Sequence, residues 1–294
     1  MSMTDPQEYF GKNEYNTYVI DSESAAEMTR LLKQDRLITS AMGGIFPERE
    51  NIDITDINDI LDIACGPGGW VLDTAYAHSD IEVTGIDIST RMIEYARTQA
   101  RVQGLENAHF HVMNALNRLE FPNNSFDMVN TRFIVGFMQA SHWPIFIQEC
   151  KRILRPGGIL RVTEMEWGFS NKQAFEKYSW LISSAFHKAR HNFSPNGLHM
   201  GLIHMLADFY QKAGFEQIKQ EACVVDFSYG TPYHEGFYHD LEVGYKLVQP
   251  FITKWGISTQ EELDQVYQQS MAEMQSEDFR SLWILLTTLG TKPR

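Results

Sequence analysis

Residues 60–70 read Ile-Leu-Asp-Ile-Ala-Cys-Gly-Pro-Gly-Gly-Trp, an apolar run that ends in a cluster of glycines. The run holds one charged side chain, Asp62, and short apolar runs of this kind are typical of buried parallel strands. Gly66, Gly68 and Gly69 break the run, and an amphipathic stretch follows. The pattern predicts a strand, a tight turn and a helix, in which the turn can approach a ligand closely because glycine has no Cβ.

A second acid stands at the end of the next predicted strand. Residues 81–86 form another apolar run, and Asp87 ends it, 25 residues after Asp62. An acid at the tip of the second strand of such a unit accepts hydrogen bonds from ribose hydroxyls. A dinucleotide fingerprint would need a third glycine where Val71 stands. The other class of cofactor with this layout, S-adenosylmethionine (SAM), has no pyrophosphate and needs no phosphate cradle.

The stretch Asp-Ile-Ala-Cys-Gly-Pro-Gly-Gly at residues 62–69 closely resembles motif I of the class I SAM-dependent methyltransferases. Ala64 departs from that motif, because many members carry glycine there. Two later stretches resemble the same family: Phe-Pro-Asn-Asn-Ser-Phe-Asp at residues 121–127 and Lys-Arg-Ile-Leu-Arg-Pro-Gly-Gly at residues 151–158. The resemblance covers residues 60–165, with the motifs in the expected order.

The order of the predicted elements indicates an α/β protein with a doubly wound, Rossmann-like, mostly parallel sheet of seven strands. A capping box at Ser24 and Glu27 begins a helix before the sheet. The expected division of the chain is an N-terminal arm and helical cap (1–58), a SAM-binding core (59–228), a helical insertion over the substrate pocket (229–278) and the last strand of the core (279–294). Within the core we expect strands over 159–165 and 216–227 and helices over 171–191 and 198–213.

The resemblance also implies which residues hold the cofactor, at the carboxyl ends of the strands, where open α/β sheets bind ligands. Asp62 and the backbone of Gly66–Gly68 would hold the amino-acid and ribose side, Asp87 the ribose hydroxyls, and Met92 and Asn114 the adenine. The full set of expected cofactor residues is Tyr18, Asp62, Ala64, Gly66, Gly68, Asp87, Ile88, Met92, Asn114, Ala115, Asn130 and Arg132.

Three of these residues have alternative interpretations. Asn114 stands where the family often carries an acid; its carbonyl can accept a hydrogen bond without a charge, or the residue serves only as part of a turn. Arg132 suits a substrate carboxylate as well as the cofactor, and a surface salt bridge is its structural alternative. Tyr18 belongs to a polar segment with four aromatic rings, which is either a docking arm or a lid whose tyrosines face a sulfonium cation.

Glu164 and His191 are the candidate general bases. Glu164 ends the expected fifth strand, and His191 ends the helix after it, where a side chain that titrates near neutral pH would be useful. Both residues have structural alternatives: Glu164 can pair with Arg161 or Arg132, and His191 can stabilise a helix C-terminus. A base is required only if the nucleophile must lose a proton.

The resemblance implies methyl transfer from SAM to an O, N or C atom of a small, secondary-metabolite-like substrate, with S-adenosylhomocysteine as the product. Because the cofactor carries its own leaving group, such a protein mainly supplies proximity and orientation. Two alternatives stay open: a SAM-fold cyclase or pericyclase that uses bound SAM without methyl transfer, and a non-catalytic SAM-binding interaction module.

Composition narrows the classes of partner. The net charge of −13 argues against nucleic acid and against an anionic membrane surface. The three cysteines show no Cys-x-x-Cys spacing, the ten histidines no metal-ligand spacing, and residues 1–13 no apolar signal-peptide core. We therefore expect a cytoplasmic protein without a metal, in which the N-terminal arm and the insertion are candidate surfaces for self-association.

Overall fold

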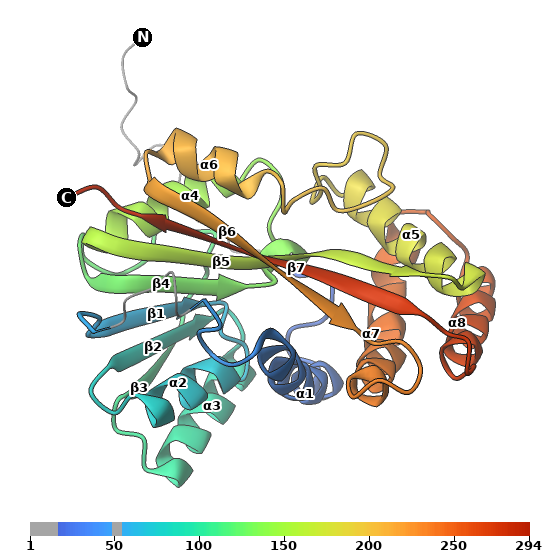
Figure 1. The fold of residues 1–294 in the computed structure, drawn as a ribbon, viewed down its shortest axis with the longest axis horizontal. Helices are drawn as coiled ribbons and strands as arrows, with labels where there is room; N and C mark the ends of the chain where they lie inside the picture. The colour runs from blue at the N-terminus through green and yellow to red at the C-terminus, as the bar shows by residue number, and fades with distance from the viewer. Residues whose placement is uncertain (1–16, 49–54) are drawn as a thin grey trace.

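The computed structural model describes residues 17–48 and 55–294, which form a seven-stranded sheet in the order β3-β2-β1-β4-β5-β7-β6 (Figure 1). Five strands run parallel: β1 (Asp59–Ile63), β2 (Glu82–Asp87), β3 (Ala108–Val112), β4 (Phe126–Arg132) and β5 (Leu154–Ser170). The remaining two are β6 (Glu216–Asp226) and β7 (Ser281–Thr291), and β7 is antiparallel to both of its neighbours. The predicted Rossmann-like, mostly parallel sheet of seven strands is confirmed.

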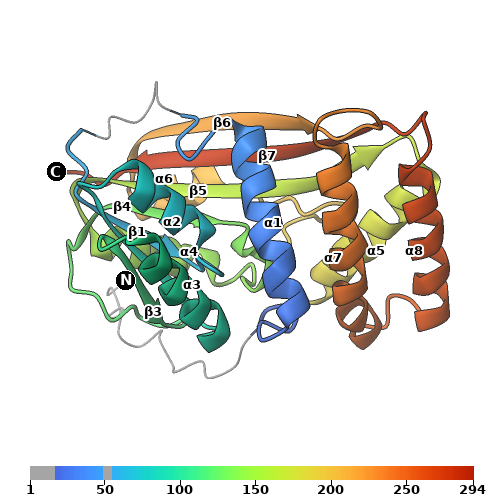
Figure 2. The same ribbon diagram turned by 90° about the horizontal axis from the view of Figure 1, so that it is seen from below.

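Helices cover both faces of this sheet (Figure 2). The described α-helices are α1 (Ala25–Met42), α2 (Gly69–Ala77), α3 (Thr90–Gln103), α4 (Trp143–Ile153), α5 (Gln173–Lys188), α6 (Leu206–Ala213), α7 (His234–Lys254) and α8 (Gln260–Met274). Apolar side chains of α2 and α3 pack with alternate residues of β1 and β2, whereas those of α4 and α6 pack on the opposite face. Within β1, Ile60 belongs to the first cluster and Leu61 to the second, as the two-residue period of a strand requires.

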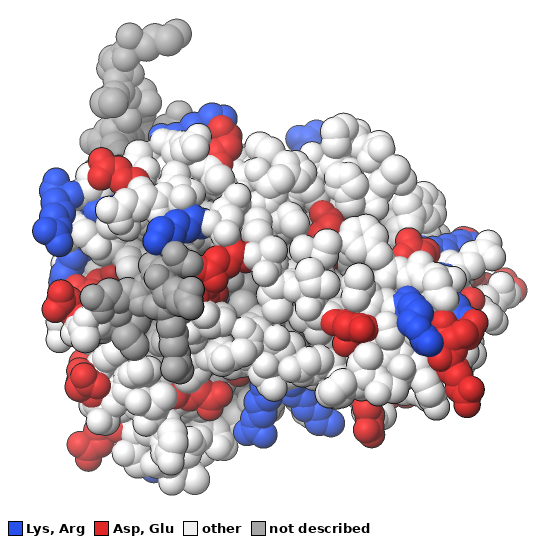
Figure 3. Space-filling model, viewed as in Figure 1, with Lys and Arg blue, Asp and Glu red and all other residues white. Residues whose placement is uncertain are grey.

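Helices α5, α7 and α8 pack together beyond the carboxyl end of the parallel strands, where β5 and β7 extend past β4 (Figure 1). Helix α1 lies between this group and α2, and it contacts both α2 and α7 (Figure 2). No helix in the described part of the chain is both long enough and apolar enough to cross a membrane. On the face in Figure 3, acidic and basic side chains are interspersed toward the edges, and the middle of the face is largely uncharged.

Strand β5 is much longer than the predicted strand over 159–165, because it spans Leu154–Ser170. Its pairing with β7 runs from Ile159, opposite Thr291, to Ser170, opposite Ser281, and the antiparallel partner supplies hydrogen bonds well beyond the end of β4. The sequence pattern places the acids of this stretch at the end of a strand, but in the structure they lie within a paired strand.

The helix predicted over 198–213 is wrong in its first half, since α6 begins only at Leu206. The preceding loop is fixed instead by the buried carboxylate of Glu166, which accepts hydrogen bonds from the N–H groups of Met200 (2.7 Å) and Gly201 (2.9 Å). Gly201 has φ +63°, and a Cβ there would lie 2.8 Å from the backbone nitrogen of Ser194. The apolar spacing of this stretch therefore reflects a packed loop.

Candidate active site

A pocket of about 280 Å³ lies at the carboxyl ends of the parallel strands, bounded by helices α1, α5 and α7. Ten of the twelve predicted cofactor residues line it: Tyr18, Asp62, Ala64, Gly66, Asp87, Ile88, Met92, Asn114, Ala115 and Arg132. The other two, Gly68 and Asn130, lie behind the wall. The topology thus gathers the ends of β1, β2 and β4 and the turn after β3 around one cavity.

The glycine turn brings backbone and carboxylate together. Gly66 has φ +54°, and its N–H donates to Oδ2 of Asp87 at 3.0 Å. Oδ1 of Asp87 accepts from the N–H of Ser89 at 2.9 Å. Ala64 also has a positive φ, +59°, a conformation that costs an L-residue about 1–2 kcal/mol. The turn after β1 therefore keeps the geometry of a glycine at a position where this chain carries alanine.

Gly68 has a packing role instead of a lining role. Its φ is +82°, and a Cβ there would lie 2.7 Å from the ring of Phe110 and 2.8 Å from Ala96. The residue permits close approach of the α2 N-terminus to α3 and β3. Gly66 is different, because the nearest atom to an added Cβ is a methyl of Leu31 at 3.8 Å.

Asp62 is a buried carboxylate at the end of β1, 5% exposed. Its Oδ1 accepts a hydrogen bond from Nδ2 of Asn130 at 2.7 Å, and Oδ1 of Asn130 accepts from Arg161 at 2.7 Å. Arg161 forms a fully buried ion pair with Glu48 at 2.9 Å. Burial raises the pKa of Asp62 to about 7. Asn130 therefore orients Asp62 and does not itself reach the pocket.

Two further predicted residues are held by specific partners. Arg132 forms an ion pair with Asp35 of α1 and donates to Oγ1 of Thr39 at 3.1 Å. Both charged side chains are only 12–13% exposed, so the surface salt bridge considered for Arg132 is in fact a largely buried pair on the pocket wall. Oδ1 of Asn114 accepts from the N–H of Leu116 at 2.9 Å, which fixes the side chain in the turn after β3.

Tyr18 lies in a docked segment. The N–H of Val19 donates to the carbonyl of Gly136 at 3.0 Å, and Oγ1 of Thr17 donates to the carbonyl of Phe137 at 2.8 Å. The Tyr18 hydroxyl donates to Glu27 at 2.7 Å, and burial raises its pKa. Residues 17–19 thus form part of the pocket wall, whereas the other three rings of the predicted arm lie outside the described residues.

Neither candidate base lines the pocket. Glu164 is fully buried inside β5, and its Oε1 accepts from the N–H groups of Ile134 (2.7 Å) and Val135 (3.3 Å). The expected pairs with Arg161 and Arg132 do not form, because those side chains pair with Glu48 and Asp35. Glu164 instead satisfies the backbone of the turn after β4, and burial raises its pKa to about 8.

His191 is also buried away from the pocket, at 3% exposure. Its Nδ1 lies 3.2 Å from the carbonyl of Val135, to which it donates, and its ring packs against Phe186 and Phe251. Burial lowers its pKa, so the ring is neutral near pH 7. The backbone N–H of His191 donates to the carbonyl of Phe186 in the last turn of α5 (2.9 Å), so the residue closes that helix through its backbone and not through a charged side chain. Both placements are corrections to the sequence prediction.

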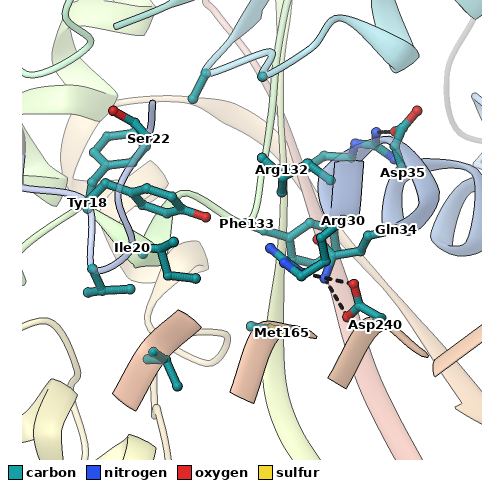
Figure 4. A pocket seen from close by; sticks show the side chains of 18 of the residues that line it. Tyr18, Ile20, Ser22, Arg30, Gln34, Asp35, Arg132, Phe133, Met165 and Asp240 are labelled. Atoms are coloured by element: carbon teal, nitrogen blue, oxygen red, sulfur yellow. Dashed lines mark hydrogen bonds and ion pairs between the residues drawn. The ribbon is translucent and has the colours of Figure 1, made fainter. Parts of the chain in front are cut away.

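A group of buried charges that was not predicted from the sequence joins α1 to α7 (Figure 4). Arg30 lies between Glu27 and Asp240, and Gln34 also donates to Asp240. Apart from Glu27, these side chains line the pocket. The sequence does contain a signal for this group: the spacing of Glu27, Arg30 and Gln34 puts them on one face of a helix, the face that also carries the buried Ile38.

The half of the pocket farthest from the glycine turn is aromatic. Its lining includes Phe133, Trp167, Phe175, Phe237, Tyr245 and Trp283. These rings come from five elements that are distant in the sequence, namely the loop after β4, β5, α5, α7 and β7. The pocket thus has a polar end at the strand termini and an apolar end beneath α5 and α7.

We expect Glu164→Gln to leave the free energy of unfolding within about 1 kcal/mol of wild type at pH 6, because a protonated glutamic acid and a glutamine both offer Oε1 to Ile134 and Val135. Glu164→Ala should lower it by about 2–4 kcal/mol. The folded-state pKa is raised, so Glu164 should make wild-type stability fall as pH rises from about 4.5 to 8, and the slope should be shallower in Glu164→Gln, where only other buried acids such as Asp62 contribute. Urea unfolding at several pH values measures both effects; a steep loss of stability in Glu164→Gln at pH 6 would contradict the assignment.

The chain is similar in sequence to known methyltransferases. The family model described as a methyltransferase domain matches residues 60–158. A demethylmenaquinone methyltransferase of Geobacillus kaustophilus is 29% identical over 147 residues, which is 42% of this chain and 62% of that protein. The match therefore spans about three fifths of that relative's length.

Two solved structures share the fold at low identity. The phosphoethanolamine N-methyltransferase 2 of Haemonchus contortus superposes with a TM-score of 0.53 at 19% identity, covering 94% of this chain and 61% of that one. The [4+2]-cyclase SpnF gives a TM-score of 0.53 at 22% identity, covering 92% of this chain and 97% of that one. The motif order, the sheet topology and the methyltransferase-domain model over residues 60–158 all support a class I, SAM-dependent methyltransferase domain in this chain.

Proposed function

We propose that this protein is a SAM-dependent methyltransferase that moves a methyl group to an O, N or C atom of a small, secondary-metabolite-like molecule. The observation that carries the proposal is the Asp87 carboxylate, anchored by the N–H groups of Gly66 and Ser89 in the same pocket as Asp62. Two acids at the ends of neighbouring parallel strands, joined across a glycine turn, match the polar groups of a ribose and an amino acid.

The residues present fit SAM. The Asp87 carboxylate accepts the N–H groups of Gly66 and Ser89, and with about four acceptor positions it keeps capacity for a ribose hydroxyl. Asp62 would face the α-ammonium group, and the guanidinium of Arg132 would lie near the α-carboxylate. Ile88 and Met92 supply apolar contacts for the adenine. Bound SAM supplies an activated methyl group on a sulfonium centre.

The chain's own part in the reaction would be orientation. Glu164 and His191 are used elsewhere in the fold, so no step is assigned to them. Aromatic faces from Phe133 and Trp283 would exclude water and suit a cationic sulfur. Holding the nucleophile in line with the methyl group is then the main contribution to rate, with helix α7 as the cover of the substrate pocket.

A cyclase or pericyclase that keeps SAM bound without transferring its methyl group is the second candidate. Two observations favour this candidate. The chain shares its fold with a [4+2]-cyclase over nearly the full length of both chains, and neither predicted base lines the pocket. Formation of S-adenosylhomocysteine distinguishes the two activities, because only methyl transfer produces it. Incubation with methyl-labelled SAM and a metabolite extract tests this directly. A non-catalytic SAM-binding interaction module is the third candidate; such a protein would bind SAM and convert no substrate.

Asp87→Ala should weaken SAM binding by about 1.5–3 kcal/mol, the usual contribution of a hydrogen bond to a charged group. Isothermal titration calorimetry measures the dissociation constant, and the exposed Asp80→Ala is the matched control, which should bind like wild type. Equal affinity in Asp87→Ala and Asp80→Ala would remove the ribose assignment and with it the proposed cofactor site.

Gly66→Ala and Gly68→Ala should have different effects: Gly68→Ala should mainly lower stability, and Gly66→Ala should mainly lower SAM affinity. At Gly68 the added Cβ meets Phe110 and Ala96, so the free energy of unfolding should fall by about 2–4 kcal/mol. At Gly66 only the strain of about 1–2 kcal/mol is expected, while SAM affinity should drop because the methyl group enters the pocket. Denaturant unfolding and calorimetry on the same samples separate the two; normal SAM binding by folded Gly66→Ala would show that the cofactor lies elsewhere.

SAM affinity should depend on the ionisation of Asp62. Its pKa in the unliganded protein is about 7, and an ammonium group nearby favours the charged form. Binding should therefore release a proton, and SAM affinity should fall up to tenfold for each pH unit below 7. Calorimetry between pH 5.5 and 7.5 in buffers of different ionisation enthalpy measures both. Asp62→Asn should bind SAM weakly, with an affinity that does not change over this pH range. Its free energy of unfolding at pH 8 should be about 2–4 kcal/mol higher than that of wild type, since the folded state no longer holds a buried charge. A wild-type profile that is flat between pH 5.5 and 7.5 would exclude this role.

A further inference from the structure

The buried charges between α1 and α7 form a compact network, here named the α1–α7 cluster and defined as Glu27, Arg30, Gln34 and Asp240. Arg30 donates to both oxygens of Glu27 (2.7 and 2.8 Å) and to Oδ1 of Asp240 (2.9 Å). Gln34 donates to Oδ2 of Asp240 at 3.0 Å. Figure 4 shows Arg30, Gln34 and Asp240 meeting on the pocket wall.

Backbone packing sets this meeting point. Gly236, Asp240 and Gly244 follow one another at four-residue intervals on one face of α7. A Cβ at Gly236 would lie 2.7 Å from a methyl of Leu37, and one at Gly244 would lie 3.5 Å from Cδ of Arg30. The two glycines let α1 approach α7 closely enough for Arg30 to reach Asp240.

The cluster has an excess of acceptors. Two carboxylates surround one guanidinium, so its formal charge is negative when all three are ionised. Burial opposes the charge on Arg30, but Asp240 and Glu27 outweigh it and hold the pKa of the guanidinium well above its usual value. Asp240 lines the pocket with its side chain 5% exposed, and its two oxygens use one lone pair each. Hydrogen-bonding capacity thus remains on a carboxylate fixed from two sides.

Apolar surface surrounds this carboxylate. Leu241, Tyr245 and Val248 of α7, Phe133 of the loop after β4 and Met165 of β5 line the same pocket. Other described carboxylates on the lining, Asp35, Asp62 and Asp87, belong to α1 and to the strand ends at the opposite, cofactor end. A molecule in the aromatic half would therefore meet Asp240 as its charged contact among mostly apolar neighbours.

We propose that Asp240 anchors the substrate by accepting a hydrogen bond from an O–H or N–H group on an otherwise apolar, ring-containing molecule. This inference rests on the proposed function and names the class of acceptor substrate: neutral or cationic hydrogen-bond donors on a flat hydrophobic scaffold. Anionic substrates are disfavoured, because the charge of the cluster repels them and its guanidinium is already paired with carboxylates.

The test uses four naphthalenes of nearly equal shape: 1-naphthol and 1-naphthylamine as donors, 1-methylnaphthalene without a donor, and 1-naphthoate as an anion. Equilibrium dialysis against the protein loaded with S-adenosylhomocysteine gives their dissociation constants. The two donors should bind at least about tenfold more tightly than 1-methylnaphthalene, which corresponds to about 1.4 kcal/mol, and 1-naphthoate should bind most weakly.

Variants separate anchoring from mere packing. Asp240→Asn should reduce the donor preference to less than about threefold and improve 1-naphthoate binding, with the affinity for S-adenosylhomocysteine unchanged. Leu37→Ala loosens the same contact between α1 and α7 without lining the pocket, so it should keep the wild-type preference. If Asp240→Asn does not fold, Gln34→Met, which removes one of the two donors that fix the Asp240 carboxylate in place, should lower the preference in part.

Each other outcome has a definite meaning. An unchanged donor preference in Asp240→Asn, its loss in Leu37→Ala, tighter binding of 1-naphthoate, or no binding of any naphthalene to the loaded protein would each overturn the proposal while leaving cofactor binding intact. Failure of S-adenosylhomocysteine itself to bind would instead contradict the proposed function, and the inference would fall with it.

Discussion

The hydrogen bond from Asn130 to Asp62 is the contact on which the cofactor end of the pocket depends. Without a fixed donor, a carboxylate buried at a strand end would adopt another rotamer, because an unsatisfied buried acceptor costs about 1–3 kcal/mol. Asn130 is itself fixed by Arg161, and Arg161 by Glu48, so a chain of buried polar groups crosses β1, β4 and β5. Every member has its partner, which is the condition under which a buried polar network stabilises a fold.

Local patterns explain how much of the fold could be predicted. The run from Ile60 to Gly69 specifies strand, turn and helix within ten residues, and the same kind of signal marks β2, with Asp87 at its end. Strand-end chemistry then follows from topology, because parallel strands present their carboxyl ends at one edge. Ten lining residues could be named from the sequence for this reason.

Long-range pairing explains what could not be predicted. Glu164 resembles a free acid at a strand end, and only the distant β7 shows that the strand continues past it. Arg30 and Asp240 are 210 positions apart in the chain, and no local periodicity links them. The loop before α6 depends on Glu166, whose carboxylate replaces a helical turn as the partner of backbone N–H groups. In each case a tertiary contact outweighs a local preference.

The junction between α1 and α7 has a consequence for how this scaffold changes over evolution. Replacing the segment between β6 and β7 alone would leave Arg30 and Glu27 buried next to a helix without Asp240, and breaking a buried pair in this way typically costs about 3–5 kcal/mol. Residues 25–42 and 234–254 lie at opposite ends of the chain, outside the segment that matches the methyltransferase model. A new ligand preference therefore requires compensating substitutions in both helices, so these two segments should covary as a unit while the motif-bearing core stays unaltered.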